Sequence, residues 1–165
     1  SMGPRQREGH PGPNVFDDDG YALNAVGLSN PSKEFDEEVE KVEGTTVVSI
    51  FGGTGGEFAE LARHFEEYAD CFELNVSCPH AEGYGTDIGA DPDLTREVTS
   101  AVVDAVDVPV WVKMTPNVTD ITEIGVAAEE AGASAVVAVN TLAAMAIDVE
   151  TGYPVLGNVQ GGLSG

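Results

Sequence analysis

The chain has 165 residues, of which 42% are hydrophobic, so it can bury a core of its own. It carries 29 acidic and only 7 basic residues, and no basic stripe is present that would meet the phosphates of a nucleic acid. No stretch approaches the roughly 20 unbroken apolar residues of a membrane helix, and the first residues lack the apolar segment of a signal peptide. We therefore expect a cytoplasmic protein with neither a nucleic-acid nor a membrane partner.

The formal net charge of −22 is extreme for a chain of this length, and the acids are dispersed along the sequence. Self-repulsion on this scale destabilises a compact fold in dilute buffer. Concentrated salt removes most of that penalty, because it shortens the Debye length to about 3 Å at 1 M. The composition thus favours a halophilic source, with an acidic protein of ordinary origin as the alternative.

Strand and helix patterns alternate from residue 31 onward. Apolar residues recur at helical spacing in four segments, and four short β-branched or apolar runs are typical of buried strands. Residues 1–23, the glycine-rich turn at 52–56 and everything from residue 140 onward are expected to be loop. The expected helices cover residues 31–42, 57–69, 91–105 and 119–131, and the expected strands cover residues 45–51, 71–75, 108–113 and 135–139.

Near-continuous apolar strands that alternate with helices predict a parallel sheet covered by helices. Three of the strands end at or next to a polar residue, namely Asn75, Lys113 and Asn140. This pattern favours a (β/α)8 TIM barrel, in which the active site lies at the carboxyl ends of the strands. Such a barrel needs eight strands and usually about 250 residues. We therefore expect an incomplete barrel, the central portion of a longer protein, with residues 1–165 forming a single domain.

The segment Asn75-Val76-Ser77-Cys78-Pro79-His80 directly follows one of these strands. A thiol at the mouth of a barrel can accept a proton if its thiolate is accessible, so Cys78 is a candidate base. Asn75 could hydrogen-bond a planar amide or imide, and His80 could tune the thiol or contact a substrate. A structural turn remains an open alternative. The other cysteine, Cys71, is expected to be a small buried residue, and the absence of a Cys-x-x-Cys pair predicts no metal site.

Lys113 ends an apolar strand, where an unpaired ammonium would cost on the order of several kcal/mol. It therefore requires an anion or a polarised carbonyl, unless its side chain reaches solvent. Asn24 and the pair Asn140-Thr141 are weaker candidates, because Asn and Thr are common in turns. The glycines at 52–56 lack the Gly-Lys-Ser/Thr ending of a phosphate loop, which favours a simple turn between strand and helix.

Together these segments resemble the class 1 dihydroorotate dehydrogenases, and order, spacing and residue type agree over nearly the whole chain. The matching segments are Asn24-Ala25-Val26-Gly27-Leu28 with Asn30-Pro31, Glu73-Leu74-Asn75-Val76-Ser77-Cys78-Pro79, Gly89 with Asp91-Pro92, Val112-Lys113-Met114-Thr115-Pro116-Asn117-Val118-Thr119-Asp120-Ile121, Ala131-Gly132-Ala133, Asn140-Thr141, and Gly161-Gly162-Leu163-Ser164-Gly165.

The resemblance implies an FMN-binding barrel that oxidises dihydroorotate to orotate in pyrimidine synthesis. It implies that Cys78 removes a proton from ring carbon 5 while hydride leaves ring carbon 6 for the flavin. It further implies a role for each of the other matched positions. Asn24, Asn75, Asn140 and Thr141 would hold the pyrimidine, the backbone of Gly27 and Leu28 would contact the substrate carboxylate, and Ser1, Asn75, Lys113, Gly161 and Gly162 would contact FMN.

Two alternatives stay open at this point. The family motif usually ends in Pro-Asn, whereas this chain has Pro79-His80, as the related dihydropyrimidine dehydrogenases do. That departure allows reduction of uracil or thymine on the same scaffold. The isolated chain would be inactive if it is an unclosed piece of a barrel with exposed sheet edges. The electron acceptor is also open between fumarate and a nicotinamide reached through an iron–sulfur/FAD electron-transfer subunit, and we expect a homo-oligomer.

Overall fold

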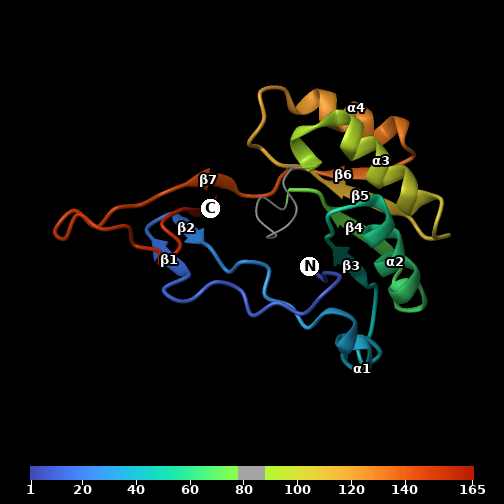
Figure 1. Cartoon of the computed structure of the whole chain (residues 1–165), viewed down its shortest axis with the longest axis horizontal. Helices are drawn as coiled ribbons and strands as arrows, with labels where there is room; N and C mark the ends of the chain where they lie inside the picture. Colours follow the sequence, from blue (N-terminus) through green and yellow to red (C-terminus); the bar gives the residue numbers. More distant parts are fainter. Residues whose placement is uncertain (78–87) are drawn as a thin grey trace. The chain divides into compact units, whose positions relative to one another are not determined.

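The computed structural model describes residues 1–77 and 88–165, apart from the side chains at 35–37. The chain divides into two compact units, which Figure 1 shows in sequence colours. Unit 1 contains residues 1–6 and 30–140, and unit 2 contains residues 7–29 and 141–165. The expectation that residues 1–165 form one domain remains a prediction.

Unit 1 is built on a four-stranded parallel sheet of order β3-β4-β5-β6. The strands are β3 (Val47–Ile50), β4 (Cys71–Asn75), β5 (Val110–Lys113) and β6 (Ala135–Val137), which confirms the four expected strands with ends shifted by up to two residues. The beginning of the chain lies beside β3, because Met2 forms an isolated parallel bridge with Ile50. All neighbouring pairs in the sheet run parallel, as the apolar runs predict.

Three helices, α2 (Gly55–Phe65), α3 (Pro92–Val103) and α4 (Ile121–Glu130), cover one face of this sheet (Figure 1). Each begins after a residue whose side-chain oxygen accepts hydrogen bonds from the backbone of the first turn: Thr54 before α2, Asp91 before α3 and Asp120 before α4. Helix α2 starts inside the glycine-rich segment, so the turn expected over residues 52–56 is shorter than predicted.

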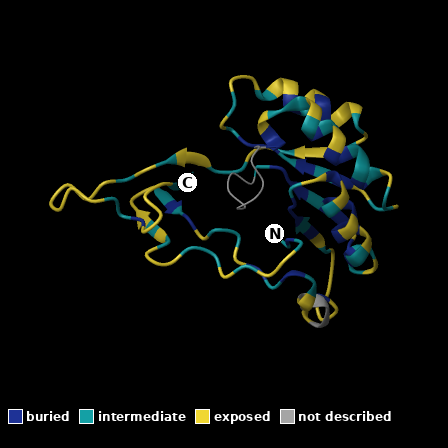
Figure 2. Cartoon of the chain, in the orientation of Figure 1, coloured by how far each residue is buried: buried dark blue, intermediate teal, exposed yellow. Residues whose placement is uncertain are grey.

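The core of unit 1 lies between the sheet and these helices. Phe58 and Phe65 from α2 and Phe72 from β4 are fully buried, as are alternate residues along the strands such as Ile50 and Leu74. Figure 2 shows that buried residues of unit 1 are concentrated where helices and sheet face one another. Because side chains alternate across a strand, the residues between them point to the opposite face of the sheet.

The remaining helical segments of unit 1 are short. The helix expected over residues 31–42 is reduced to η1 (Ser32–Phe35) and α1 (Asp36–Val39), and residues 66–69 of the next predicted helix form the 3-10 turn η2 (Glu66–Tyr68) and its end. A further 3-10 turn, η3 (Ile88–Ala90), precedes α3. The buried Asn30 explains part of this, since its Oδ1 accepts from the backbone N–H of Ser32 at 2.9 Å and of Gly3 at 3.1 Å.

Unit 2 contains an antiparallel sheet of order β1-β2-β8-β7. Its strands are β1 (Val15–Asp18), β2 (Tyr21–Asn24), β7 (Leu142–Ala144) and β8 (Gly161–Ser164). The expectation of loop for residues 1–23 and from residue 140 onward is therefore wrong for the residues in these four strands. These strands have only three or four residues, and β8 begins with two glycines, so neither length nor alternation marks them in the sequence.

The buried core of unit 2 is small, with Leu23, Ala25 and Leu156 at its centre. Several apolar side chains of this unit are exposed, among them Val149 and Tyr153.

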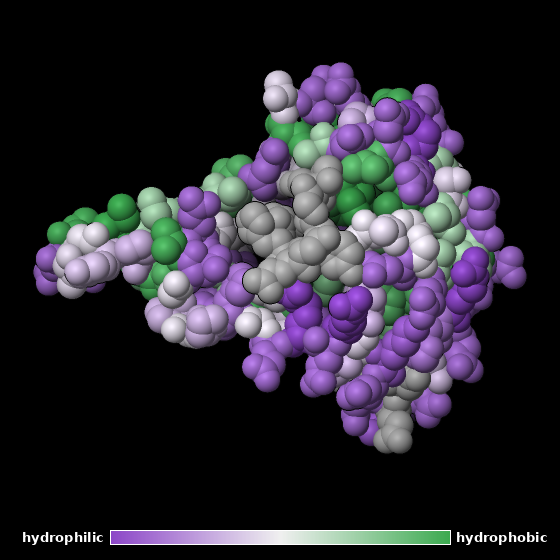
Figure 3. Space-filling view, viewed as in Figure 1, coloured by the Kyte–Doolittle hydropathy of each residue, from purple (hydrophilic) through white to green (hydrophobic). Residues whose placement is uncertain are grey.

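Much of the face drawn in Figure 3 is hydrophilic, as the acidic composition leads one to expect. Among the helices that the structure describes, none is long and apolar enough to cross a membrane.

Candidate active site

A row of polar side chains occupies the face of the parallel sheet that the helices leave uncovered. Ser49 on β3 stands opposite Glu73 on β4, and Asn75 on β4 stands opposite Lys113 on β5. These residues are out of phase with the buried apolar residues of the same strands, so they project to the other side of the sheet. Asn75 and Lys113 are the last residues of their strands, which places them at the edge where barrel active sites form.

Two asparagines and a serine form a closed hydrogen-bonded triangle at this edge. Asn140 Nδ2 donates to Asn75 Oδ1 at 3.2 Å and also to Ser77 Oγ, while Ser77 Oγ donates to Asn75 Oδ1 at 2.9 Å. Asn140 is held in place by its backbone N–H, which donates to the carbonyl of Met114 at 2.8 Å. Asn75 is only 5% exposed, so the triangle fixes the orientation of its carboxamide.

A chain of hydroxyl groups connects Asn75 to Glu73. Asn75 Nδ2 donates to Ser1 Oγ at 3.2 Å, Ser1 Oγ lies 2.8 Å from Ser49 Oγ, and Ser49 Oγ donates to Glu73 Oε1 at 2.8 Å. A hydroxyl has one hydrogen, and Ser49 uses its hydrogen on the carboxylate. Ser1 is therefore the donor to Ser49, and every hydrogen bond in the chain points toward Glu73.

Lys113 completes the network, because its Nζ lies 3.2 Å from the same Glu73 oxygen. The two side chains are 26% and 16% exposed, respectively. The requirement of Lys113 for an anion, inferred from its position at the end of an apolar strand, is thus met by Glu73, and a lysine that simply reaches solvent is excluded. Sequence reasoning did not single out Glu73 or Ser49 as site residues. The available signal was a carboxylate two positions before Asn75 in a strand otherwise apolar.

Of the two cysteines, Cys71 lies within the described residues. Cys71, at the start of β4, is 4% exposed, as expected for a small buried residue. Burial, and secondarily the nearby charge of Glu73, raises the pKa of its thiol to about 11, so it is a poor nucleophile at neutral pH. Cys78 and His80 lie outside the described residues.

Four of the other expected site residues come together within unit 2. Asn24, at the end of β2, pairs with Gly162 in β8. A Cβ added to Gly161 would lie 2.5 Å from the Asn24 carbonyl oxygen, and a Cβ added to Gly162 would lie 2.0 Å from Thr141 Oγ1. Both glycines are therefore required by close approach of neighbouring groups.

Gly27 and Leu28 lie in the loop that follows β2. Both have positive φ, +76° and +56°, so the backbone reverses there. His10 contacts the backbone just before these residues: its backbone N–H donates to Val26 O at 3.0 Å, and its ring Nδ1 lies 3.1 Å from Ala25 O. Ser1, Asn75, Lys113 and Asn140 thus belong to the network of unit 1, whereas Asn24, Gly27, Leu28, Thr141, Gly161 and Gly162 belong to unit 2.

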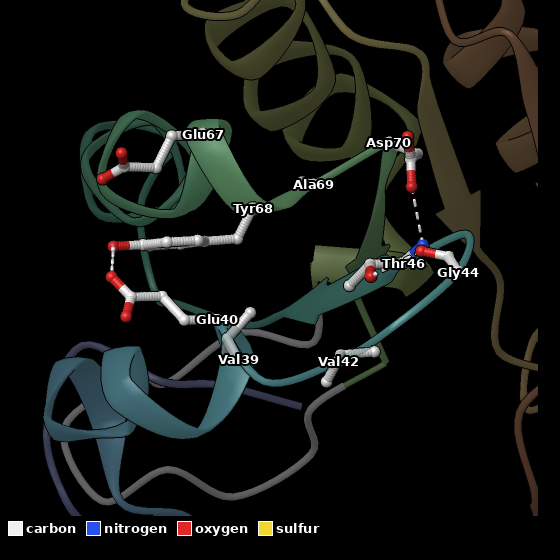
Figure 4. Close-up of a pocket in the computed structure, with 9 residues that line it drawn as sticks. All are labelled: Val39, Glu40, Val42, Gly44, Thr46, Glu67, Tyr68, Ala69 and Asp70. Atoms are coloured by element: carbon white, nitrogen blue, oxygen red, sulfur yellow. Dashed lines mark hydrogen bonds between the residues drawn. The ribbon is translucent and has the colours of Figure 1, made fainter.

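A hollow of about 300 Å³ lies elsewhere on unit 1, next to the segments that lead into β3 and β4 (Figure 4). Several of its polar groups already have partners: Tyr68 Oη donates to Glu40 at 3.4 Å, and Asp70 accepts from the backbone N–H of Thr46 at 2.7 Å. It lies at the amino ends of the strands, away from Asn75 and Lys113. In barrel enzymes this end contributes to stability, not to catalysis.

Four parallel strands covered by helices, with polar residues gathered at their carboxyl ends, are the arrangement of part of a (β/α) barrel. Two solved structures of a dihydroorotate dehydrogenase from Eimeria tenella share this fold. The ligand-free form matches with a TM-score of 0.75 at 19% identity, and the complex with ferulenol with a TM-score of 0.73 at 18% identity. The matches cover all of this chain and 56% and 54% of those chains, which confirms a partial barrel.

Sequence comparison gives the family. The family model "Dihydroorotate dehydrogenase" matches residues 1–165, so the chain belongs to the dihydroorotate dehydrogenase family. The protein named "Dihydroorotate dehydrogenase B (NAD(+)), catalytic subunit" from Methanosarcina mazei is 57% identical, and its namesake from Pyrococcus abyssi is 51% identical. Each match covers the whole of this chain, which spans 54% and 56% of those relatives' lengths.

Proposed function

We propose that the full-length protein oxidises dihydroorotate to orotate in pyrimidine synthesis, with FMN as its cofactor, as a class 1 member of the family. The observation that carries this proposal is the network of Asn75, Asn140, Ser1 and Lys113 at the carboxyl ends of the barrel strands. The names of relatives with up to 57% identity support dihydroorotate as the substrate. They also favour it over the uracil or thymine alternative that His80 suggests.

The donor set of unit 1 fits a flavin. It offers an ammonium, carboxamides and hydroxyls on one face of a sheet, which suits a planar ring with hydrogen-bonding edges and a negative charge in its reduced form. Lys113 would bind at the flavin ring, together with Ser1 and Asn75, and Gly161 and Gly162 are proposed as further contacts of the cofactor. FMN supplies a two-electron acceptor for hydride.

The substrate would be held by hydrogen bonds from carboxamides and a hydroxyl. Asn75 is preorganised for this by its bonds to Asn140 and Ser77, so binding costs little reorientation. Asn24 and Thr141 are proposed as further ligands of the pyrimidine, and the backbone at Gly27 and Leu28 as ligands of its carboxylate.

The reaction removes one hydride and one proton from dihydroorotate. Cys78, as a thiolate, would take the proton from ring carbon 5, and hydride would leave ring carbon 6, so that a carbon–carbon double bond forms. Cys71 is unsuited to this role, because burial and Glu73 raise the pKa of its thiol to about 11. The assignment to Cys78 rests on the family resemblance, since residue 78 lies outside the described residues.

The proposal is tested with the full-length protein in multimolar salt. Orotate formation is followed with dihydroorotate and an artificial electron acceptor, in parallel with uracil and thymine assays that use a nicotinamide. We expect orotate formation and bound FMN. A flavin-loaded protein that forms no orotate contradicts the proposal. Cys78→Ala should lower turnover by roughly 10²–10⁴-fold, as for loss of a catalytic base. Cys71→Ala, which removes the buried thiol, is the matched control and should retain turnover.

We further propose a partner subunit that carries an iron–sulfur cluster and FAD and passes electrons to a nicotinamide. The support is the printed name of the relatives, which are catalytic subunits of an NAD(+) enzyme. We expect NAD+ reduction only when that subunit is added to the full-length protein. NAD+ reduction by the full-length protein alone, or failure of the two to copurify, would argue against it. A homo-oligomer and a cytoplasmic location remain predictions.

A further inference from the structure

We infer that Glu73 is a positioning residue that holds the Lys113 ammonium at the cofactor site and offsets part of its charge, so that Glu73 lowers the reduction potential of the bound flavin. The inference rests on the proposed function, since it concerns the FMN that Lys113 would contact. Its own basis is the geometry of the Ser49–Glu73–Lys113 contacts.

The Glu73 carboxylate is fixed from two neighbouring strands. Ser49 on β3 donates to Oε1 at 2.8 Å, and Lys113 on β5 lies 3.2 Å from the same oxygen. Glu73 itself stands on β4 between them, so all three side chains start from adjacent strands of one sheet. A long lysine side chain has many conformers, and a fixed carboxylate selects the few in which its Nζ reaches Oε1.

The hydrogen-bond chain adds to this effect. The donors from Asn75 through Ser1 and Ser49 all point toward Glu73, and a carboxylate is the natural end of such a chain because it only accepts. The carboxamide edge of the site and the Lys113 ammonium are therefore coupled through one carboxylate. Replacing that carboxylate should alter the electrostatics at Lys113 while leaving the triangle of Asn75, Asn140 and Ser77 in place.

The sign of the effect follows from charge. Reduction adds negative charge to the flavin, and a nearby cation stabilises the reduced form and raises its potential. Glu73 lies within hydrogen-bond distance of Lys113, so the pair presents less net positive charge than the lysine alone. Interactions between partly buried groups are weakly screened by salt, so the effect should persist in a saline buffer.

The test is the midpoint potential of FMN in the full-length protein, measured for the wild type, Glu73→Gln and Glu73→Asp. Gln removes the charge and keeps the shape, whereas Asp keeps the charge and withdraws it by one methylene. We expect Glu73→Gln to raise the potential most, by at least a tenfold change in the two-electron equilibrium constant, about 30 mV. Glu73→Asp should raise the potential by a smaller amount. If Glu73→Gln fails to retain FMN, the potential measured for Glu73→Asp tests the inference.

Glu130→Gln is the matched control. It also removes one carboxylate from an ion pair, that of Glu130 with Arg96 at 2.9 Å, but on helix α4 at the opposite face of the sheet. It should leave the potential unchanged. Wild-type potentials in the flavin-loaded Glu73 variants, or shifts to lower values, overturn the inference. A wild-type protein that binds no FMN would instead defeat the proposed function, so the two failures are distinct.

Discussion

Asn140 and Asn75 are 65 positions apart in the sequence, yet Asn140 Nδ2 donates to Asn75 Oδ1 at 3.2 Å. Asn75 ends β4 and Asn140 follows β6, and both strands belong to the same parallel sheet. The two side chains therefore lie at the carboxyl edge of that sheet. The contact leaves the Asn75 carboxamide with one orientation, in which its oxygen accepts from Asn140 and Ser77 and its nitrogen donates to Ser1.

Asn140→Ala should lower kcat/KM for dihydroorotate by about 10–100-fold in the full-length protein, because loss of a hydrogen bond at a buried polar group costs about 1–3 kcal/mol. Steady-state kinetics with dihydroorotate check this. Asn158→Ala is the control, since Asn158 is exposed and donates only to the nearby Gln160 carbonyl among the bonds seen in unit 2. Equal kcat/KM values for the two variants would show that Asn140 is not part of the active site.

The raised pKa of Cys71 predicts a pH-dependent stability. The folded protein keeps the thiol protonated up to a pKa of about 11, whereas the unfolded chain releases the proton near the ordinary cysteine pKa of 9.0. The stabilising contribution is therefore complete below about pH 9 and is lost as the pH rises toward 11. Each pKa unit corresponds to about 1.4 kcal/mol, so a loss of roughly 1–3 kcal/mol is expected.

Urea unfolding of the full-length protein at roughly pH 8, 9.5 and 11 measures this loss, because these values span the expected window. The comparison is with Cys71→Val, which fills the same space without a titrating group. The wild type should lose more stability than the variant over this range. Parallel pH curves for the two proteins would show that the Cys71 thiol titrates normally.

Gly162→Ala should destabilise the sheet of unit 2. The new Cβ would lie 2.0 Å from Thr141 Oγ1, much closer than atoms can approach, so strand β8 or Thr141 must move. Overpacking of this kind typically costs about 1–3 kcal/mol, and occasionally more. Thermal unfolding and FMN content report the effect.

Gly56→Ala serves as the counterpart. Gly56 lies in the first turn of α2, and a Cβ there would have its nearest neighbour at 3.8 Å. Alanine in a helix is more stable than glycine by about 0.5–1 kcal/mol, so this variant should match or exceed the wild type. The prediction fails if Gly162→Ala melts at the same temperature as Gly56→Ala.

The net charge of −22 predicts a strong dependence of stability on salt. The melting temperature of the full-length protein should rise as KCl increases from about 0.1 M to above 1 M, because the Debye length falls from about 10 Å to about 3 Å. Replacing the exposed Glu67, Glu97, Glu123 and Glu129 together with glutamine should weaken this dependence. A melting temperature that does not change with salt would contradict a halophilic origin.

Local sequence patterns determined the parallel half of the fold. The strand expected over residues 71–75 matches β4 in full, and the helix expected from residue 91 onward begins there as α3, with Asp91 as its N-cap. These features depend on neighbouring residues, so periodicity and capping rules can detect them. The polar ends of the strands also identified Asn75, Lys113 and Asn140 as residues of one edge, because parallel strands have a fixed direction.

The tertiary structure decided what depends on contacts between distant segments. The antiparallel pairing of β2 with β8 joins residues about 140 positions apart. Short strands such as Gly161–Ser164 have no alternation of apolar and polar residues from which the pairing could be predicted. Likewise the sequence showed that Lys113 needs an anion but not which one. The lateral register of β4 and β5 brings Glu73 within 3.2 Å of Lys113, and register is fixed by packing of whole strands, not by either residue alone.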